Sequence, residues 1–284
     1  MTSTAYTNSW QTNGTVKFLS IASGDIRYLD LGQGQPLLLI HTLRTQLDYF
    51  QKVIPLLADE YRILAIDLPG HGYSSIPTEA PFDEPFFRKS VIEFIEQMNL
   101  RNLILVGESI GGVLALTVGA SLPDRINHIF AFNPYDYGDK FGGGIRRGRY
   151  GFIIGLFALF GRFTYEIAPA LKLVLSGGLV EPTKLPQSLF SEFVRVGNQK
   201  GYRQAEYLLY KYWRSWLDAK RLYDEVKAPV TLVDSEQDWS YPQEREDRKK
   251  HLSGAKFFVI PAAGHFSALE APKRFAEIIN DVSL

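Results

Sequence analysis

The 284-residue sequence contains no cysteine, which excludes disulfides, thiolate nucleophiles and thiolate metal ligands but leaves the cellular compartment open. It also lacks net charge, because 31 lysines and arginines balance 31 aspartates and glutamates. Without an excess of positive charge the chain has no field to attract a phosphate backbone, so we expect no nucleic-acid partner. The eleven-residue apolar stretch at 151–161 is too short to span a bilayer core of ~30 Å.

Residues 1–15, MTSTAYTNSWQTNGT, are polar. They lack the basic and apolar regions of a secretory signal, and they contain none of the arginines that are typical of a transit peptide. We interpret them as a flexible N-terminal segment of a soluble, cytoplasmic protein.

From residue 16 onward, apolar residues follow two kinds of pattern. Residues 16–31 alternate between apolar and polar, which predicts two antiparallel strands joined by a turn at residues 23–25. Unbroken apolar runs follow, separated by stretches with helical spacing. This alternation is typical of an α/β fold with a mostly parallel central sheet covered by helices on both faces. The runs occupy residues 37–40, 63–66, 103–106, 129–132, 230–233 and 257–260, and helical spacing is found at residues 83–100, 111–120 and 272–280.

The strand pattern is interrupted between residues 133 and 219, where only helical spacing is found. A chain of this length fits one domain with an insertion better than two full domains. We therefore predict a core formed by residues 16–132 and 220–284, with residues 133–219 inserted as a helical cap, or lid.

A serine stands at the sharp turn between the third apolar run and the helix that follows it. The segment VGESIGG, residues 106–112, places Ser109 between two glycines in a G-x-S-x-G pattern. Glycines are needed there because side chains would collide with the neighbouring strand and helix. The turn lifts the serine hydroxyl above the carboxyl edge of the sheet, where open parallel sheets bind ligands. Ser109 is therefore a candidate nucleophile.

A serine hydroxyl needs a base and an orienting carboxylate to act as a nucleophile near neutral pH. Both are found in the expected order, acid before histidine, in loops that follow predicted strands. Asp238 lies 129 residues after Ser109, and His265 lies 27 residues further on.

Together these motifs resemble those of the α/β-hydrolase fold superfamily, and in particular its capped serine esterases. The match runs from about residue 16 to the end of the sequence, excluding the predicted cap. The resemblance implies Ser109 as nucleophile, His265 as general base and then acid, and Asp238 as the group that orients His265. The matching segments are GESIG at residues 107–111, DLPGHGYS at residues 67–74, Asp238-Trp239 with Pro242, and Gly264-His265-Phe266.

The resemblance also implies an oxyanion hole formed by the backbone N–H groups of Leu43 and Ile110. The corresponding loop in the family reads His-Gly-x, but Thr42 stands where the glycine is expected. Three explanations stay open: the local backbone tolerates Thr42, its hydroxyl adds a donor, or the hole is misshapen. The choice matters because one lost oxyanion donor costs on the order of 100-fold to 1000-fold in rate.

Arg44 also stands where a small residue is common in the family. It either forms a partly exposed ion pair with Asp48, four residues on, or binds an anionic part of the substrate. The candidate substrate-binding residues are therefore Thr42, Arg44, Trp239 and Phe266.

Other titratable residues near these loops have weaker links to catalysis. Asp136 is a rival acid, because some families of this fold place the carboxylate after the run at residues 129–132. Asp234 and Glu236 are interpreted as hydrogen-bonded loop residues. His71 is interpreted as an element of its turn, and His41 as an anchor of its loop.

The sequence predicts no cofactor and no metal. The segment GQG at residues 32–34 lacks the third glycine of a dinucleotide-binding loop and precedes a strand instead of a helix. No His, Asp and Glu residues have the spacing of metal ligands. Water is the only co-reactant implied.

The predicted function is that of a serine hydrolase that cleaves a carboxylic ester or related acyl compound through an acyl-enzyme. Its expected partner is a small, apolar acyl substrate. Lactonase, thioesterase, carbon–carbon hydrolase and acyltransferase activities use the same triad and stay open. Two further alternatives are a non-hydrolytic lyase or isomerase, and a receptor module that binds a ligand.

The apolar stretch at residues 151–161 has two interpretations. It is buried between cap and core, or it forms an apolar entrance that rests on a membrane surface. In the second case four arginines would face the lipid head groups: Arg146, Arg147, Arg149 and Arg162. The sequence leaves the oligomeric state open.

Overall fold

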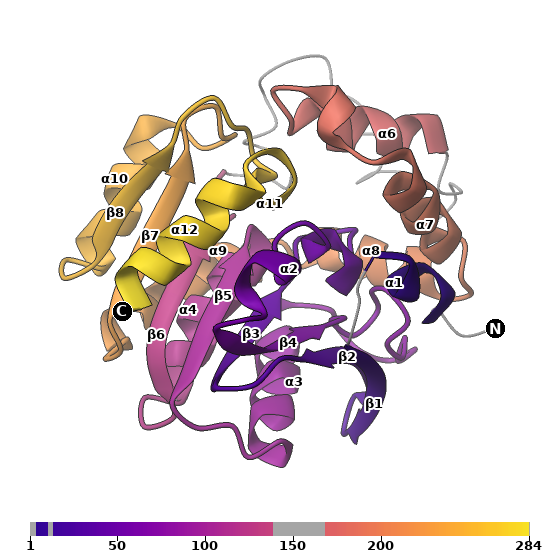
Figure 1. Ribbon diagram of the computed structural model, residues 1–284, viewed down its shortest axis with the longest axis horizontal. Helices are drawn as coiled ribbons and strands as arrows, with labels where there is room; N and C mark the ends of the chain where they lie inside the picture. The colour runs from indigo at the N-terminus through magenta and orange to yellow at the C-terminus, as the bar shows by residue number, and fades with distance from the viewer. Residues whose placement is uncertain (1–3, 11–13, 139–167, 284) are drawn as a thin grey trace.

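The computed structural model describes residues 4–10, 14–138 and 168–283. Its centre is an eight-stranded sheet with the strand order β1-β2-β4-β3-β5-β6-β7-β8 (Figure 1). The strands are β1 (Thr15–Ile21), β2 (Gly24–Leu31), β3 (Gln35–Ile40), β4 (Tyr61–Ile66), β5 (Leu103–Glu108), β6 (Ile126–Phe132), β7 (Val230–Ser235) and β8 (Lys256–Ile260).

The pairing of the strands confirms the predicted α/β sheet. β1 and β2 form an antiparallel hairpin, and β2 also runs antiparallel to β4. All later neighbours are parallel. Leu38 in the middle of β3 lies beside Leu64 of β4 and Leu105 of β5, and all three are fully buried. Such strands are continuously apolar because helices cover both of their faces.

Helices cover the sheet where the spacing predicts them. α4 (Ile110–Ser121) packs behind β5 and β6, with α3 (Glu84–Gln97) beside it (Figure 1). α2 (Ile54–Leu57) and α12 (Pro272–Ser283) lie in front of the sheet, and Phe275 of α12 stacks on Phe132 of β6. The remaining core elements are η1 (Leu47–Phe50), η3 (Ala219–Glu225), α10 (Pro242–His251) and α11 (Ser267–Glu270).

β8 is less buried than its unbroken apolar run predicts. Phe257 and Val259 are 42% and 59% exposed. β8 is the edge of the sheet, and an edge strand has a neighbour on one side only.

The N-terminal segment also differs from the flexible one that its polarity predicts. Residues 4–10 form a helix, α1 (Thr4–Trp10), that packs on the core. The Thr7 hydroxyl donates to Asp48 at 2.7 Å, and the Trp10 indole N–H donates to the same carboxylate at 2.9 Å. A buried carboxylate far along the chain therefore orders this segment, and a local polar pattern does not reveal such a partner.

In the described part of the predicted insertion, four helices lie between β6 and β7 in the chain. They are α6 (Ala168–Gly177), α7 (Gln187–Gly197), α8 (Tyr202–Lys211) and α9 (Arg214–Asp218), with the short η2 (Pro182–Lys184) between the first two. Figure 1 shows α6 and α7 on the side to which the arrowheads of β5 and β7 point. The stretch 151–161 and the arginines at 146, 147, 149 and 162 lie outside the described residues. None of the helices in the described ranges is long and apolar enough to cross a membrane.

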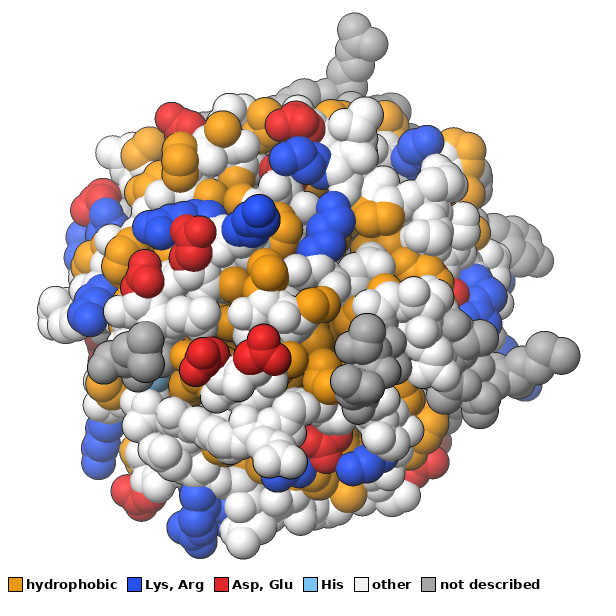
Figure 2. All heavy atoms as spheres, viewed as in Figure 1, with side chains coloured by type: hydrophobic (Ala, Val, Ile, Leu, Met, Phe, Trp, Pro, Cys, Tyr) orange, Lys and Arg blue, Asp and Glu red, His pale blue; other side chains and the backbone are white. Residues whose placement is uncertain are grey.

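Acidic and basic side chains are interspersed on the face shown in Figure 2. This mixture agrees with the equal numbers of basic and acidic residues, 31 of each. Such a face supplies no field of one sign to steer a polyanion.

Candidate active site

Ser109 occupies a strained turn between β5 and α4. Its φ of 61° and ψ of −120° lie outside the regions that L-residues prefer. A Cβ at Gly107 would lie 2.0 Å from the carbonyl oxygen of Gly111, and a Cβ at Gly111 would lie 2.1 Å from that of Ile40. The two glycines are therefore required for the reason that the sequence predicts: the backbones of α4 and β3 approach too closely for a side chain.

His265 contacts both other members of the predicted triad. Its Nε2 lies 2.8 Å from Ser109 Oγ, and its Nδ1 lies 2.6 Å from Asp238 Oδ1. Ser109 follows β5, Asp238 follows β7 and His265 follows β8, so the carboxyl ends of parallel strands bring the three residues together. All three are buried. A hydroxyl, an imidazole and a carboxylate in this order can transfer a proton from oxygen to nitrogen.

Asp238 is held in its ionised form. Burial raises the pKa of its carboxyl, but the charge and hydrogen bond of His265 and the bonds from Ser240 outweigh burial and lower the pKa to about 2. The ordinary value is 3.8, so these contacts stabilise the fold fully above that pH and lose their effect as the pH falls towards 2. The carboxylate therefore accepts the Nδ1–H of His265 across the physiological pH range.

Asp136, the rival acid, does not face His265. Its carboxylate accepts two hydrogen bonds from Arg248, both 2.9 Å long. The same guanidinium donates to Asp234 at 3.0 Å. Glu236 accepts a backbone N–H from the loop after β8 at 3.0 Å. Asp234 and Glu236 are thus hydrogen-bonded as predicted, and Asp238 is the carboxylate in contact with the histidine.

Replacing Arg248 by methionine is expected to lower the free energy of unfolding by about 3–5 kcal/mol. The guanidinium is fully buried among Asp136, Asp234 and the carbonyl of Pro134, so its loss leaves two buried carboxylates without a cation. Urea unfolding followed by circular dichroism would measure the change. Lys250→Met removes a cation from the exposed side of the same helix and should cost less than about 0.5 kcal/mol. Equal losses in the two variants would contradict the prediction.

His41 anchors the loop that follows β3. Its Nδ1–H donates to the carbonyl of Thr42 at 2.7 Å, and its Nε2 accepts the N–H of Leu68 at 3.0 Å. Burial holds the pKa of His41 well below its ordinary value, so the ring stays neutral. The Thr45 hydroxyl donates to the same Thr42 carbonyl at 2.8 Å. In the described chain the residues with positive φ include Arg44 but not Thr42, so the Thr42 backbone does not require glycine.

The two predicted oxyanion donors lie on adjacent segments. Leu43 is in the turn that follows Thr42, and Ile110 is the first residue of α4. The first N–H groups of a helix have no partner within it, and they carry the positive end of its dipole. A Cβ at Gly111 would lie 2.7 Å from the His41 carbonyl oxygen, so the first turn of α4 lies against this loop. That Leu43 and Ile110 bind an oxyanion stays a prediction.

Arg44 does not pair with Asp48, so that alternative is wrong. Its Nε lies 3.4 Å from Glu206 of α8, and both side chains are buried. Residues four apart meet on a helix, but Arg44 has a φ of 59° and lies in a turn. The Asp48 carboxylate instead accepts a bond of 3.2 Å from Arg27 in the core.

Aromatic side chains surround His265. Trp239 stacks on the imidazole with 4.0 Å between ring centroids, and Phe266 meets its edge at 5.2 Å. Tyr135, which the sequence did not indicate, also contacts the ring edge-on at 5.8 Å. Trp239 and Phe266, which the sequence predicts as substrate-binding residues, therefore both contact the ring of His265.

Glu108 is a second residue that the sequence reasoning missed. Its buried carboxylate accepts the N–H of Ser267 at 2.7 Å, the side-chain amide of Asn133 at 3.2 Å and the Tyr49 hydroxyl. It thereby ties the serine turn to the loop that carries His265. Burial raises the pKa of Glu108, and its hydrogen bonds oppose that rise. In the sequence, the one indication of this role is that a charged residue ends an otherwise apolar strand.

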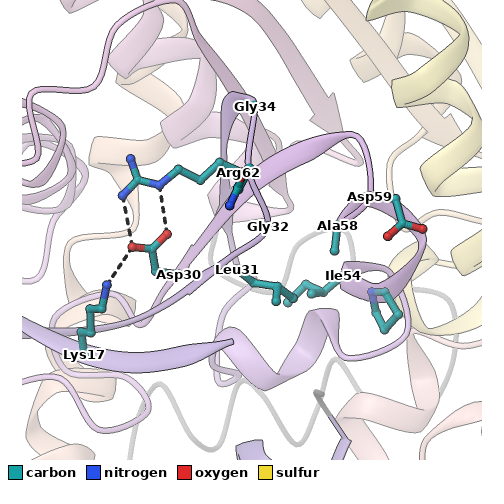
Figure 3. Close-up of a pocket in the computed structure, with 11 residues that line it drawn as sticks. Lys17, Asp30, Leu31, Gly32, Gly34, Ile54, Ala58, Asp59 and Arg62 are labelled. Carbon is teal, nitrogen blue, oxygen red and sulfur yellow. Dashed lines mark hydrogen bonds and ion pairs between the residues drawn. The ribbon is translucent and has the colours of Figure 1, made fainter. Parts of the chain in front are cut away.

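No group of three or more His, Asp or Glu residues in the described ranges is arranged to hold a metal ion. A hollow whose lining includes residues 30–34 lies at the amino ends of β3 and β4 (Figure 3). Ser109 follows the carboxyl end of β5. Three of its charged residues pair with one another, because Asp30 accepts bonds of 3.0 Å from both Arg62 and Lys17. This hollow is separate from the candidate active site.

The sequence profile of the alpha/beta hydrolase fold matches residues 35–272. The chain therefore belongs to the α/β-hydrolase family, and it is a hydrolase of this fold.

Individual proteins are similar to this chain over most of its length. A pimeloyl-[acyl-carrier protein] methyl ester esterase of Neisseria meningitidis is 24% identical over 252 residues, which cover 86% of this chain and 91% of that protein. The crystal structure of Cfl2 from Burkholderia cenocepacia has a TM-score of 0.80 and 21% identity, covering 95% of this chain and 96% of that one. The carboxylesterase CesB from Bacillus subtilis has a TM-score of 0.78 and 18% identity, covering 98% and 95%. At these identities the structures show a common fold.

Proposed function

We propose that this protein hydrolyses a carboxylic ester, or a related acyl compound, through an acyl-enzyme on Ser109. The observation that carries the proposal is the placement of His265 Nε2 at 2.8 Å from the Ser109 hydroxyl, with Asp238 on the other ring nitrogen. Esterases among the similar proteins support it, since the Neisseria relative acts on a methyl ester.

In this mechanism the Ser109 oxygen attacks the carbonyl carbon while His265 takes the hydroxyl proton on Nε2. Asp238 keeps the other proton on Nδ1 and stabilises the imidazolium. The N–H groups of Leu43 and Ile110 would bind the oxyanion, and His265 would then protonate the leaving alcohol. Water, activated by the same histidine, releases the acid in a second round.

We further infer that residues 133–219 form a cap over this site. Support comes from the end of α6, where the carbonyl of Gly177 and that of the following Gly178 accept N–H bonds from Trp239 and Phe266 beside the triad. A closed cap excludes water before acylation and shapes the pocket around an apolar acyl group.

A screen of the purified protein tests the proposed function. Esters, thioesters and lactones of graded chain length would be assayed, and a fluorophosphonate probe would be mapped by peptide mass spectrometry. We expect turnover of an ester series and a label on Ser109. A label without turnover of any acyl compound would favour a lyase or isomerase. No label and no turnover would favour a ligand-binding module.

Arg44→Ala is expected to lower kcat/KM for esters that carry a carboxylate about tenfold more than for neutral esters of equal length. Arg44 is buried in the proposed oxyanion loop, where its positively charged guanidinium would bind an anionic part of the substrate in addition to Glu206. Steady-state kinetics on paired substrates would measure the difference. The control is Arg195→Ala, which removes a half-exposed guanidinium from α7. Equal loss on acidic and neutral esters would show that Arg44 does not select charge.

A further inference from the structure

The imidazole of His265 lies flat against an indole. The ring centroids of Trp239 and His265 are 4.0 Å apart and the ring planes differ by 13°. Trp239 directly follows Asp238 in the loop after β7, so one short segment provides both the carboxylate at the edge of the imidazole and the ring on its face. Trp239 is only 6% exposed, so water is largely excluded from the stack.

The position of Trp239 is set by the end of α6. The indole N–H donates to the carbonyl of Gly177 at 3.2 Å. The next carbonyl, that of Gly178, accepts the N–H of Phe266 at 3.4 Å. A Cβ added at Gly264 would lie 2.4 Å from that same carbonyl oxygen. The last residue of α6 thus contacts the loop of the acid, and the residue after it contacts the loop of the base.

An indole face is electron-rich, and it attracts a cation held above it. In the proposed mechanism His265 is neutral before the reaction and becomes an imidazolium when it takes the Ser109 proton. The attraction between Trp239 and His265 therefore increases as the transition state forms. Only an interaction that strengthens in this way raises kcat.

We propose that Trp239 is a positioning residue that acts through His265: its ring face holds the imidazole in line with Ser109 and stabilises the imidazolium, and α6 keeps the indole in place. The inference rests on the proposed hydrolase function. It assigns Trp239 a role different from the substrate contact that the sequence predicts. A substrate contact would change mainly KM, whereas an effect on the imidazolium changes kcat.

Two substitutions at Trp239 separate these roles. Trp239→Leu keeps an apolar side chain but removes the aromatic face, and it is expected to lower kcat on a short neutral ester about tenfold, with KM changed less than twofold. Labelling by a fluorophosphonate should slow by a similar factor. Trp239→Phe restores a ring face and is expected to recover most of the lost rate. A raised KM with unchanged kcat in Trp239→Leu would overturn the proposal, and so would equal rate losses in both variants.

A substitution at the residue that follows α6 tests the same inference without changing the indole. An alanine Cβ at Gly178 would lie 2.4 Å from the Phe266 ring and 2.8 Å from the Trp239 ring, so Gly178→Ala must displace them. The control is Gly254→Ala, because nothing lies within 4 Å of a Cβ there. We expect Gly178→Ala to lower kcat with little change in KM. Equal activity of the two alanine variants would overturn the role of α6.

Failure of this inference can be distinguished from failure of the proposed function. Thermal unfolding of each variant identifies those that fail to fold, and if Trp239→Leu is among them, Trp239→Phe and Gly178→Ala decide the question. A wild-type protein without acyl turnover would reject the proposed function. A wild type that turns over esters, with kcat unchanged in all three variants, would reject only the inference.

Discussion

Ser109→Ala is expected to lower kcat for ester hydrolysis by about 10⁶-fold, the size of loss found when a serine nucleophile is removed from a triad. The hydroxyl is 2.8 Å from His265 Nε2, and without it the imidazole has no oxygen to deprotonate. The fold should survive because alanine retains the Cβ of serine. Initial rates on the best ester of the screen, together with fluorophosphonate labelling, would measure the effect.

Ser191→Ala is the matched control for this loss. Ser191 lies on the exposed side of α7, so the variant should keep full activity and label normally. Turnover above the rate of the uncatalysed reaction by more than about 10⁴-fold in Ser109→Ala would show that another group is the nucleophile.

Asp238→Asn is expected to lower kcat by about 10⁴-fold. An amide keeps the size of the carboxylate but can donate a proton to His265 Nδ1, which favours the tautomer with hydrogen on Nε2. That tautomer cannot accept the proton of Ser109. The 2.6 Å contact between Asp238 and His265 makes this the most sensitive position in the acid loop. Steady-state kinetics at several pH values would measure the loss.

Asp136→Asn is the informative comparison for Asp238→Asn. The Asp136 carboxylate accepts hydrogen bonds from Arg248 and from the Tyr223 hydroxyl and does not contact His265, so we expect lower stability and a kcat within about threefold of wild type. A large loss of kcat in Asp136→Asn with normal activity in Asp238→Asn would reverse the assignment of the acid.

Much of the core and of the triad could be predicted because their signals are local. The parallel strands contain short, mostly apolar runs, and Ser109, Asp238 and His265 each stand shortly after such a run. Parallel strands place their carboxyl ends at one edge of a sheet, so residues that follow them converge whatever their separation in the chain. The glycines at 107 and 111 are explained by the same local backbone.

Contacts that depend on how distant elements pack could not be predicted. Spacing alone suggested Asp48 as the partner of Arg44, but the partner is Glu206, on a helix of the insertion. The exposure of Val259 follows from the edge position of β8, and strand order is not encoded in a run of four residues. The stack of Trp239 on His265 likewise joins two loops, and no periodic pattern relates them.

The wide separation of the triad in the chain also has a consequence for protein synthesis. Ser109 and His265 are 156 positions apart, and in the fold the pairing of β7 with β6 and of β8 with β7 places the loop of His265 beside the serine turn. A ribosome translates the message from the N-terminus, so a nascent chain displays the serine turn well before the imidazole has been made. Translation therefore separates in time the appearance of the Ser109 hydroxyl from its contact with His265.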